Sequence, residues 1–271
     1  MKYTAKELKG NVNISKTSPL KEFSILLGGS LAGLVIIYIF LGFVVDIIAP
    51  RLSPEIEQKL GNLYRPIFKN AEHSNAADEL QRLLQNLLDK SDWHDVPFKA
   101  HLVKTEKVNA IALPGNNIVV YSGLINELAS ENALSFVLAH ELGHYANRDH
   151  IKGLGRALIL VVLSSTLLGA DNPVTNFLSN SLYNTELKFS QKKETKADLW
   201  ALDLMDRHYG HVAGATQFFK TLGKKEGRGK LAYYFASHPH PDIRVEFIEK
   251  EIKSRKYRIG HTISLNDVFK D

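Results

Sequence analysis

The sequence predicts a mostly helical α+β protein with a small β-sheet, preceded by one transmembrane helix. Three observations lead to this fold class. A charge-free apolar run extends from residue 23 to residue 45. Alternating apolar and polar residues, interrupted by a turn sequence, occupy residues 97–124. Most of the remaining chain has the apolar spacing of one-sided helices.

The composition excludes several classes of protein. With 271 residues the chain has room for one large domain with appendages. It contains 0 cysteines, which excludes a disulfide framework, a cysteine zinc ribbon, a cysteine nucleophile and a lipid-bearing cysteine. The net charge of +5 comes from scattered lysines, without a basic run interleaved with aromatic residues. We therefore expect no nucleic-acid partner.

Residues 1–22 form a polar, lysine-rich tail, and residues 23–47 form the predicted transmembrane anchor. A helix rises about 1.5 Å per residue, so about 20 apolar residues cross a hydrocarbon core of about 30 Å. A cleaved signal peptide has a shorter apolar region of roughly 7–15 residues. The residues after the run are also a poor cleavage site. The sequence thus predicts an uncleaved anchor that contacts the lipid bilayer.

The distribution of lysine predicts the orientation of this anchor. Lys2, Lys6, Lys9, Lys16 and Lys21 precede it. Only Arg51 and Lys59 lie within the next fifteen residues after it. By the positive-inside rule, the tail is cytoplasmic and the rest of the chain lies on the extracytoplasmic side of a single-pass protein.

We expect a helical linker over residues 48–74 and one domain over residues 75–271. The domain begins with a helix whose leucines follow the i, i+3, i+4 rule: Leu80, Leu83, Leu84, Leu87 and Leu88. A small sheet follows, with a hairpin turn at residues 114–117. The apolar residues 157–170 are short for a membrane span. They predict a buried helix or one at the membrane interface, with a hairpin that dips into the membrane surface as the alternative.

The most informative motif lies in a helix expected over residues 128–148, for which Ser130 is a candidate N-cap. His140 and His144 are four residues apart and therefore share one helical face. Two imidazoles on one face can bind one metal ion. Glu141 lies beside the first histidine, as in the His-Glu-x-x-His motif of zinc peptidases.

A catalytic zinc site takes three protein ligands, and two residues compete for the third place. His150 would extend the motif as in metzincins, but the Met-turn of that class has no convincing counterpart here. Glu194 lies in a second predicted helix and shares a face with Asp198. Glu194 is the favoured ligand, and Asp198 is then placed to orient a ligand histidine, preferably His140.

Four blocks of the sequence resemble a family of membrane-linked zinc metallopeptidases, which includes the protease HtpX, the protease BepA and the type 1 CAAX prenyl proteases. The blocks are residues 109–115 with 119–124, residues 140–149, residues 194–198, and Ser237-His238-Pro239 with Arg244. They occur in the family's order and cover roughly residues 75–250. HtpX and the prenyl proteases have more membrane spans, so a prenylated substrate is not implied.

The resemblance implies a zincin-like (gluzincin) catalytic domain with one zinc ion held by His140, His144 and Glu194. It implies that Glu141 is the general base and that His238, supported by Arg244, donates to the oxyanion. We expect a zinc endopeptidase of the cell inner membrane that cleaves polypeptides in quality control of envelope proteins. Two alternatives remain: a processing protease with one dedicated substrate, and a non-catalytic, zinc-containing membrane adaptor or chaperone.

Overall fold

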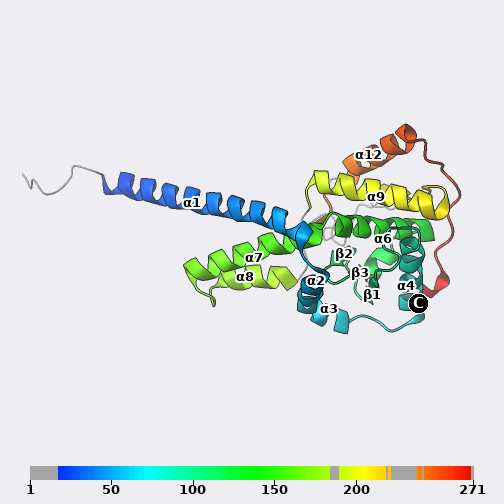
Figure 1. Cartoon of the computed structure of the whole chain (residues 1–271), viewed down its shortest axis with the longest axis horizontal. Helices are drawn as coiled ribbons and strands as arrows, with labels where there is room; N and C mark the ends of the chain where they lie inside the picture. The colour runs from blue at the N-terminus through cyan, green and yellow to red at the C-terminus, as the bar shows by residue number, and fades with distance from the viewer. Residues whose placement is uncertain (1–17, 184–188, 218, 221–236, 240, 270–271) are drawn as a thin grey trace, which may run out of the picture.

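The computed structural model describes residues 18–183, 189–217, 219–220, 237–239 and 241–269. Its first helix, α1 (Pro19–Ile48), extends away from the rest of the chain (Figure 1). The window that qualifies α1 as a membrane span is only 6% buried in the protein. One helix thus covers the residues of the expected anchor and begins about one turn before them. Residues 1–17 of the expected tail lie outside the described residues.

The segment after α1 packs onto the domain. It contains η1 (Ala49–Arg51), α2 (Pro54–Gly61), η2 (Asn62–Tyr64) and α3 (Arg65–Lys69). Most of residues 48–69 are helical, whereas residues 70–74 are not, and Ala71 forms a β-bridge with Val103. Glu57 and Tyr64 are buried, so these helices form part of the domain.

The helix expected to follow is α4 (Asn75–Leu88). The Ser74 side chain caps it by accepting a hydrogen bond from the Ala77 amide. The side chains expected to form its apolar face are all buried: Leu80, Leu83, Leu84, Leu87 and Leu88. Burying leucine side chains stabilises a domain by roughly 1.5–3 kcal/mol each. This face therefore fixes α4 on the core.

The small sheet has three strands, β1 (Lys99–Val103), β2 (Ala110–Leu113) and β3 (Asn117–Tyr121). Their order is β1-β3-β2, with β1 parallel and β2 antiparallel to β3. The turn between β2 and β3 has positive φ angles at Gly115 and Asn116, +79° and +63°. These two residue types adopt such angles readily, which confirms the expected hairpin.

The short α5 (Ser122–Ile125) leads to α6 (Glu131–Ala146), which runs through the centre of the domain between the sheet and α9 (Gln191–Tyr209) (Figure 1). Ser130 caps α6 as expected. A Cβ added to Gly143 would lie 2.9 Å from the Ala197 backbone. Only glycine permits this close approach, which brings the side chains of α9 onto the face of α6 that carries the histidines.

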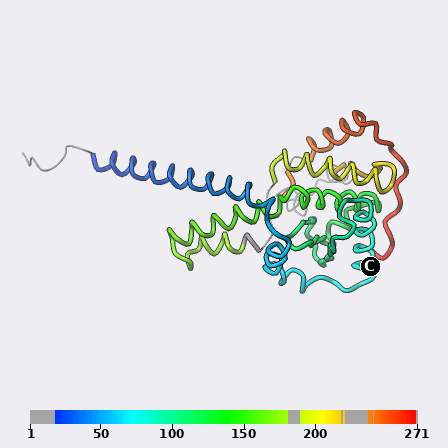
Figure 2. The backbone as a smooth tube through the Cα atoms, viewed as in Figure 1, coloured from blue at the N-terminus to red at the C-terminus, as the bar shows by residue number. Residues whose placement is uncertain are grey.

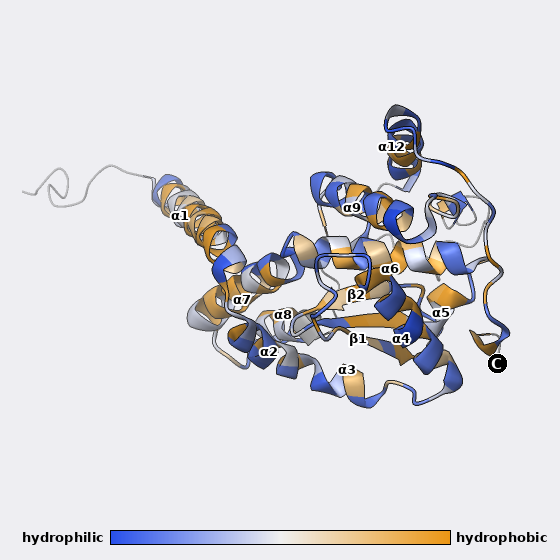
Figure 3. Cartoon of the chain, turned by 45° about the vertical axis from the view of Figure 1, so that its right-hand side comes forward, coloured by the Kyte–Doolittle hydropathy of each residue, from blue (hydrophilic) through white to orange (hydrophobic). Residues whose placement is uncertain are grey.

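α7 (Asp149–Leu168) and α8 (Pro173–Tyr183) form a helical hairpin that projects on the same side as α1 (Figure 3). Residues 157–170 lie in this hairpin. The buried form of this expected helix is wrong, because only 17% of the most apolar α7 window is buried. The interfacial helix and the dipping hairpin stay predictions. Sequence alone does not separate an apolar core helix from an apolar surface helix.

The last long helix is α12 (Pro241–Ser254), with proline at its first position, where helices tolerate it because its missing amide proton is not needed. The chain then runs back across the domain to η3 (Asp267–Phe269), which packs beside α4 (Figure 2). The side chain of Asn266 donates to Glu79 of α4. These contacts tie α12 to the same core that supports α6.

Candidate metal centre

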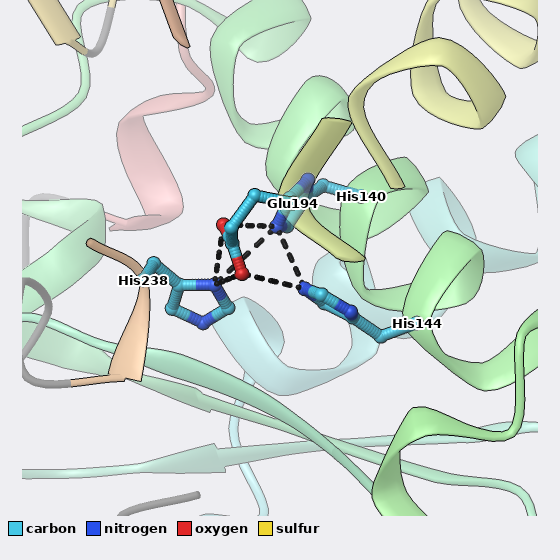
Figure 4. A group of neighbouring side chains, drawn as sticks. All are labelled: His140, His144, Glu194 and His238. Atoms are coloured by element: carbon cyan, nitrogen blue, oxygen red, sulfur yellow. Dashed lines mark hydrogen bonds and ion pairs between the residues drawn. The ribbon is translucent and has the colours of Figure 1, made fainter. Parts of the chain in front are cut away.

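Helix α6 presents His140 and His144 on one buried face. Their Nε2 atoms lie 3.1 Å apart, and the two side chains are no more than 2% exposed. Glu194 approaches from α9, with Oε2 3.5 Å from His140 Nε2 and Oε1 3.3 Å from His144 Nε2. The structure thus brings together the three residues expected to hold zinc (Figure 4).

A fourth side chain, His238, completes the group. Its Nδ1 lies 3.2 Å from Glu194 Oε2 and 3.4 Å from His140 Nε2. One ligand atom from each of the four residues lies within 4.8 Å of the other three. The sequence predicted that His238 acts on the substrate. The geometry also brings its ring into the group of metal-ligating atoms (Figure 4).

The residues of this group fit a zinc ion. Two imidazoles and one carboxylate are a common donor set of catalytic zinc sites. Burial alone would raise the pKa of Glu194, but the charges of His238 and Arg244 lower it, so this carboxylate is an anion. Glu141 adds a second sign of function. Its Oε1 is buried and has no hydrogen-bond partner among the described residues.

The other oxygen of Glu141 is fixed by the sheet. Oε2 accepts a hydrogen bond of 2.9 Å from the backbone amide of Ala112 in β2. This bond holds the carboxylate so that Oε1 faces the metal-ligating group, 3.6 Å from His238 Nε2. A carboxylate with one satisfied oxygen and one available oxygen is suited to accept a proton.

A buried ion pair between α12 and α9 supports the metal-ligating group. Arg244 of α12 donates to both oxygens of Asp198, at 2.6 and 2.9 Å, and to Glu194 Oε2 at 2.8 Å. Asp198 Oδ1 lies 3.0 Å from His140 Nδ1, the histidine it was expected to orient. Burial alone would raise the pKa of Asp198, but Arg244 and the hydrogen bond with His140 lower it.

Two contacts of His144 were not predicted. Asp149 Oδ2 lies 3.1 Å from His144 Nδ1, and Lys193 Nζ lies 3.1 Å from the other oxygen of Asp149. The Phe189 ring stacks on the His144 ring at 4.0 Å. Asp149 reaches back because Arg148 between the two helices has a left-handed φ of +58°. Nothing in the sequence pattern signals this bend.

The competing third ligand, His150, lies elsewhere. It is fully buried, and its Nε2 lies 3.0 Å from Glu57 Oε1. His150 is thus engaged with the segment that follows α1 and is not part of the metal-ligating group. His208 and His211 also lie outside this group.

Comparison with known proteins agrees with this geometry. The model of "Peptidase family M48" matches residues 74–252. Mitochondrial metalloendopeptidase OMA1 of Schizosaccharomyces pombe is 29% identical over 175 residues, which cover 63% of this chain and 51% of that protein. Metalloprotease YcaL of Escherichia coli is 29% identical over 189 residues, which cover 68% and 72% of the two chains.

A further relative is the Beta-barrel assembly-enhancing protease of Yersinia pestis, 28% identical over 161 residues, which cover 55% of this chain and 33% of that protein. The chain spans about half the length of OMA1 and a third of the Yersinia protein. The matched residues contain α4, the sheet and the whole metal-ligating group. The chain therefore belongs to peptidase family M48, a family of zinc metalloproteases.

Proposed function

We propose that this chain is a membrane-anchored zinc endopeptidase that cleaves misfolded or misassembled envelope proteins. His140, His144 and Glu194 hold the zinc ion. The observation that carries the proposal is the buried Oε1 of Glu141, which has no hydrogen-bond partner among the described residues and faces the metal-ligating group. A site that bound zinc only for stability would need no such base, which disfavours a non-catalytic adaptor.

The chain's own residues can perform peptide hydrolysis in the following way. Bound zinc supplies a Lewis acid that acidifies water and polarises the scissile carbonyl. Glu141 Oε1 accepts the proton of the attacking water and later delivers it to the leaving amine. His238 Nε2 faces the same space and donates a hydrogen bond to the carbonyl oxygen as that oxygen gains charge.

The supporting residues hold these groups in place. Asp198 accepts from His140 Nδ1, which leaves Nε2 of that ring free for the metal. Arg244 neutralises Asp198 and positions Glu194, which is its proposed role in supporting the site. All of these side chains are at most 2% exposed. A substrate therefore requires a movement that opens the site.

The location of the enzyme is part of the proposal. α1 has the length and apolar character of a membrane span. The lysines that precede it support a cytoplasmic N-terminus and an extracytoplasmic catalytic domain at the cell inner membrane. The name of the Yersinia relative connects that protein with β-barrel assembly, which supports a role in envelope quality control.

The test is Glu141→Gln in the full chain. Gln keeps the size of the side chain and the acceptor for the Ala112 amide but cannot accept a proton. We expect unchanged zinc content and at least a 10²-fold loss of cleavage of an unfolded polypeptide, within the usual range for a general base. The same variant can then retain substrates for identification among envelope proteins. Normal cleavage by Glu141→Gln would refute the mechanism.

A further inference from the structure

The α7–α8 hairpin leaves the domain in the same direction as α1 (Figures 1 and 3). The C-terminal part of α1 packs against the first turns of α7. A Cβ on Gly155 of α7 would lie 2.7 Å from a methyl group of Val45 in α1. One residue further, Arg156 donates a hydrogen bond of 2.5 Å to Asp46. Glycine packing and an ion pair thus fix the base of the hairpin against the base of the anchor.

Beyond Arg156 the hairpin changes in character. α7 carries no charged residue between Ala157 and Leu168. Large apolar side chains on both helices of the hairpin are exposed by 37–69%: Leu158, Leu160, Val162, Leu167, Leu168, Val174 and Phe177. An exposed apolar patch of this extent marks a surface that another apolar phase covers. α1, whose C-terminal end packs against the base of the hairpin, has the same character, because many of its large apolar side chains are also exposed.

Four hydroxyl groups of the hairpin are satisfied within it. The hydroxyls of Ser164, Ser165 and Thr166 donate to backbone carbonyls one turn earlier in α7. Thr175 of α8 donates to Ser164 and to the carbonyl of Gly169. Hydroxyls in hydrocarbon must find partners inside the protein, because no water is present there. This arrangement favours lipid over water as the surrounding medium.

From these observations we propose that the α7–α8 hairpin inserts into one leaflet of the same bilayer that α1 crosses. The inference rests on the membrane anchoring proposed above. From Arg156 to Leu168 the helix spans about 18 Å at 1.5 Å per residue, against about 40 Å for α1 from Asp46 to Pro19. α1 is therefore long enough to cross a hydrocarbon core of about 30 Å, whereas this part of α7 is not.

The turn of the hairpin sets its inclination. Asp171 lies in this turn, and a carboxylate at the bilayer centre costs about 2.5–3.5 kcal/mol even on the most permissive scale. An inclined hairpin keeps the apolar side chains in the acyl region while Asp171 stays nearer the headgroups. The Arg156–Asp46 pair then lies at the membrane surface, where both charges are partly hydrated.

The absence of cysteine makes this insertion measurable at single sites. Val162→Cys and Phe177→Cys place an environment-sensitive fluorophore on α7 and α8 of the full chain, at positions that are 60% and 69% exposed. Ile36→Cys on α1 is the membrane control. Ile243→Cys on α12 is the control for an exposed apolar position on the catalytic domain. Zinc content reports that each labelled protein has folded.

The proteins are reconstituted into phospholipid vesicles that contain a nitroxide on acyl carbon 5 or acyl carbon 12. We expect blue-shifted emission at Val162→Cys and Phe177→Cys. Both labels should also be quenched, more strongly by the nitroxide on carbon 5 than by the one on carbon 12. The quenching should reach at least half of that at Ile36→Cys. Ile243→Cys stays unquenched. Quenching at Ile36→Cys alone would overturn the hairpin's insertion and leave the anchor intact.

Two other results would also overturn the inference. Blue-shifted but unquenched hairpin labels would show that protein, such as a second copy of the chain, covers this surface. Unquenched Ile36→Cys would refute the anchor itself and, with it, insertion into a shared bilayer. The peptidase activity of the same preparations is measured separately, so that failure of catalysis is distinguishable from failure of insertion.

Discussion

Glu57 accepts a hydrogen bond from Tyr145, the residue directly after the second histidine of the metal-ligating group. Glu57 is 2% exposed and also pairs with Arg148 and His150. Its helix, α2, follows α1 after a short turn, and its three partners lie where α6 turns into α7. One buried carboxylate therefore connects the segment beside the membrane anchor to the helix that carries the metal ligands.

Replacing this carboxylate should destabilise the domain. Burial alone would raise the pKa of Glu57, but hydrogen bonds from His150 and Tyr145 and the charge of Arg148 lower it to about 2. A folded-state pKa below the ordinary value of 4.5 stabilises the fold at neutral pH. The difference corresponds to about 3 kcal/mol. We expect Glu57→Gln to lose stability of this order at pH 7.

The acid dependence provides the sharper measurement. The contribution of Glu57 is complete above pH 4.5 and is lost as the pH falls towards 2, where the folded protein also takes up the proton. The free energy of unfolding can be measured in urea by the fluorescence of Trp93, which packs against Tyr145. As the pH is lowered, it should fall less in Glu57→Gln than in the unaltered protein. Glu55→Gln, at an exposed position of the same helix, is the control. Equal stability of the two variants would contradict the prediction.

The third zinc ligand can be assigned by comparing two variants. Glu194→Ala removes a carboxylate that lies 3.3–3.5 Å from both histidines of α6. We expect it to lose zinc on dialysis, since two protein ligands hold zinc weakly. His150→Ala should keep zinc, because this ring contacts Glu57 instead. Metal analysis of both proteins decides the point, and zinc loss only in His150→Ala would reverse the assignment.

The parts of this site that depend on local spacing were predictable. His140 and His144 share a face in any regular helix, and the same holds for Glu194 and Asp198. Gly143 and its close contact with Ala197 explain why the two helices meet at these faces. The cap at Ser130 and the turn at residues 114–117 were also predictable, because each depends on a few neighbouring residues.

The contacts that depend on the path of the chain were not predictable. Glu57 meets Tyr145 across 88 residues, and the Ala112 amide meets Glu141 across 29. No spacing rule connects such positions. The exposure of α7 was left open by the sequence for a different reason. Leucine and valine occur in a protein core and in a lipid-facing helix alike, so composition alone did not show that α7 is exposed.

Asp149 provides a test of a contact that only the structure reveals. It holds Nδ1 of His144, and Lys193 keeps the carboxylate charged and in place. Carboxylates that hold a metal-ligating histidine through a hydrogen bond typically improve metal affinity or activity by 10–100-fold, on the order of 1–3 kcal/mol. We expect Asp149→Asn to weaken zinc binding by that factor, as measured by competition with a chelator. Asp92→Asn at an exposed site is the control, and unchanged affinity in Asp149→Asn would exclude the role.

The geometry allows two roles for His238, as a donor to the oxyanion or as a ring that blocks the site, and kinetics can separate them. Its Nδ1 faces Glu194 and its Nε2 faces Glu141, so the ring can donate to a substrate oxygen in the space beside the general base. If it stabilises the oxyanion, His238→Ala should lower kcat by about 10²–10³. Zinc content should stay unchanged, because His140, His144 and Glu194 remain.

The opposite outcome has a clear structural meaning. One ring nitrogen of His238 lies within 4.8 Å of a ligand atom of each of the other three residues, so this ring could serve as a fourth ligand if zinc were bound. A faster His238→Ala enzyme with full zinc content would show that the ring blocks the site at rest and must move before a substrate binds. Steady-state cleavage of an unfolded polypeptide, measured together with zinc content, separates the two roles, because only a blocking ring yields a gain in kcat on removal.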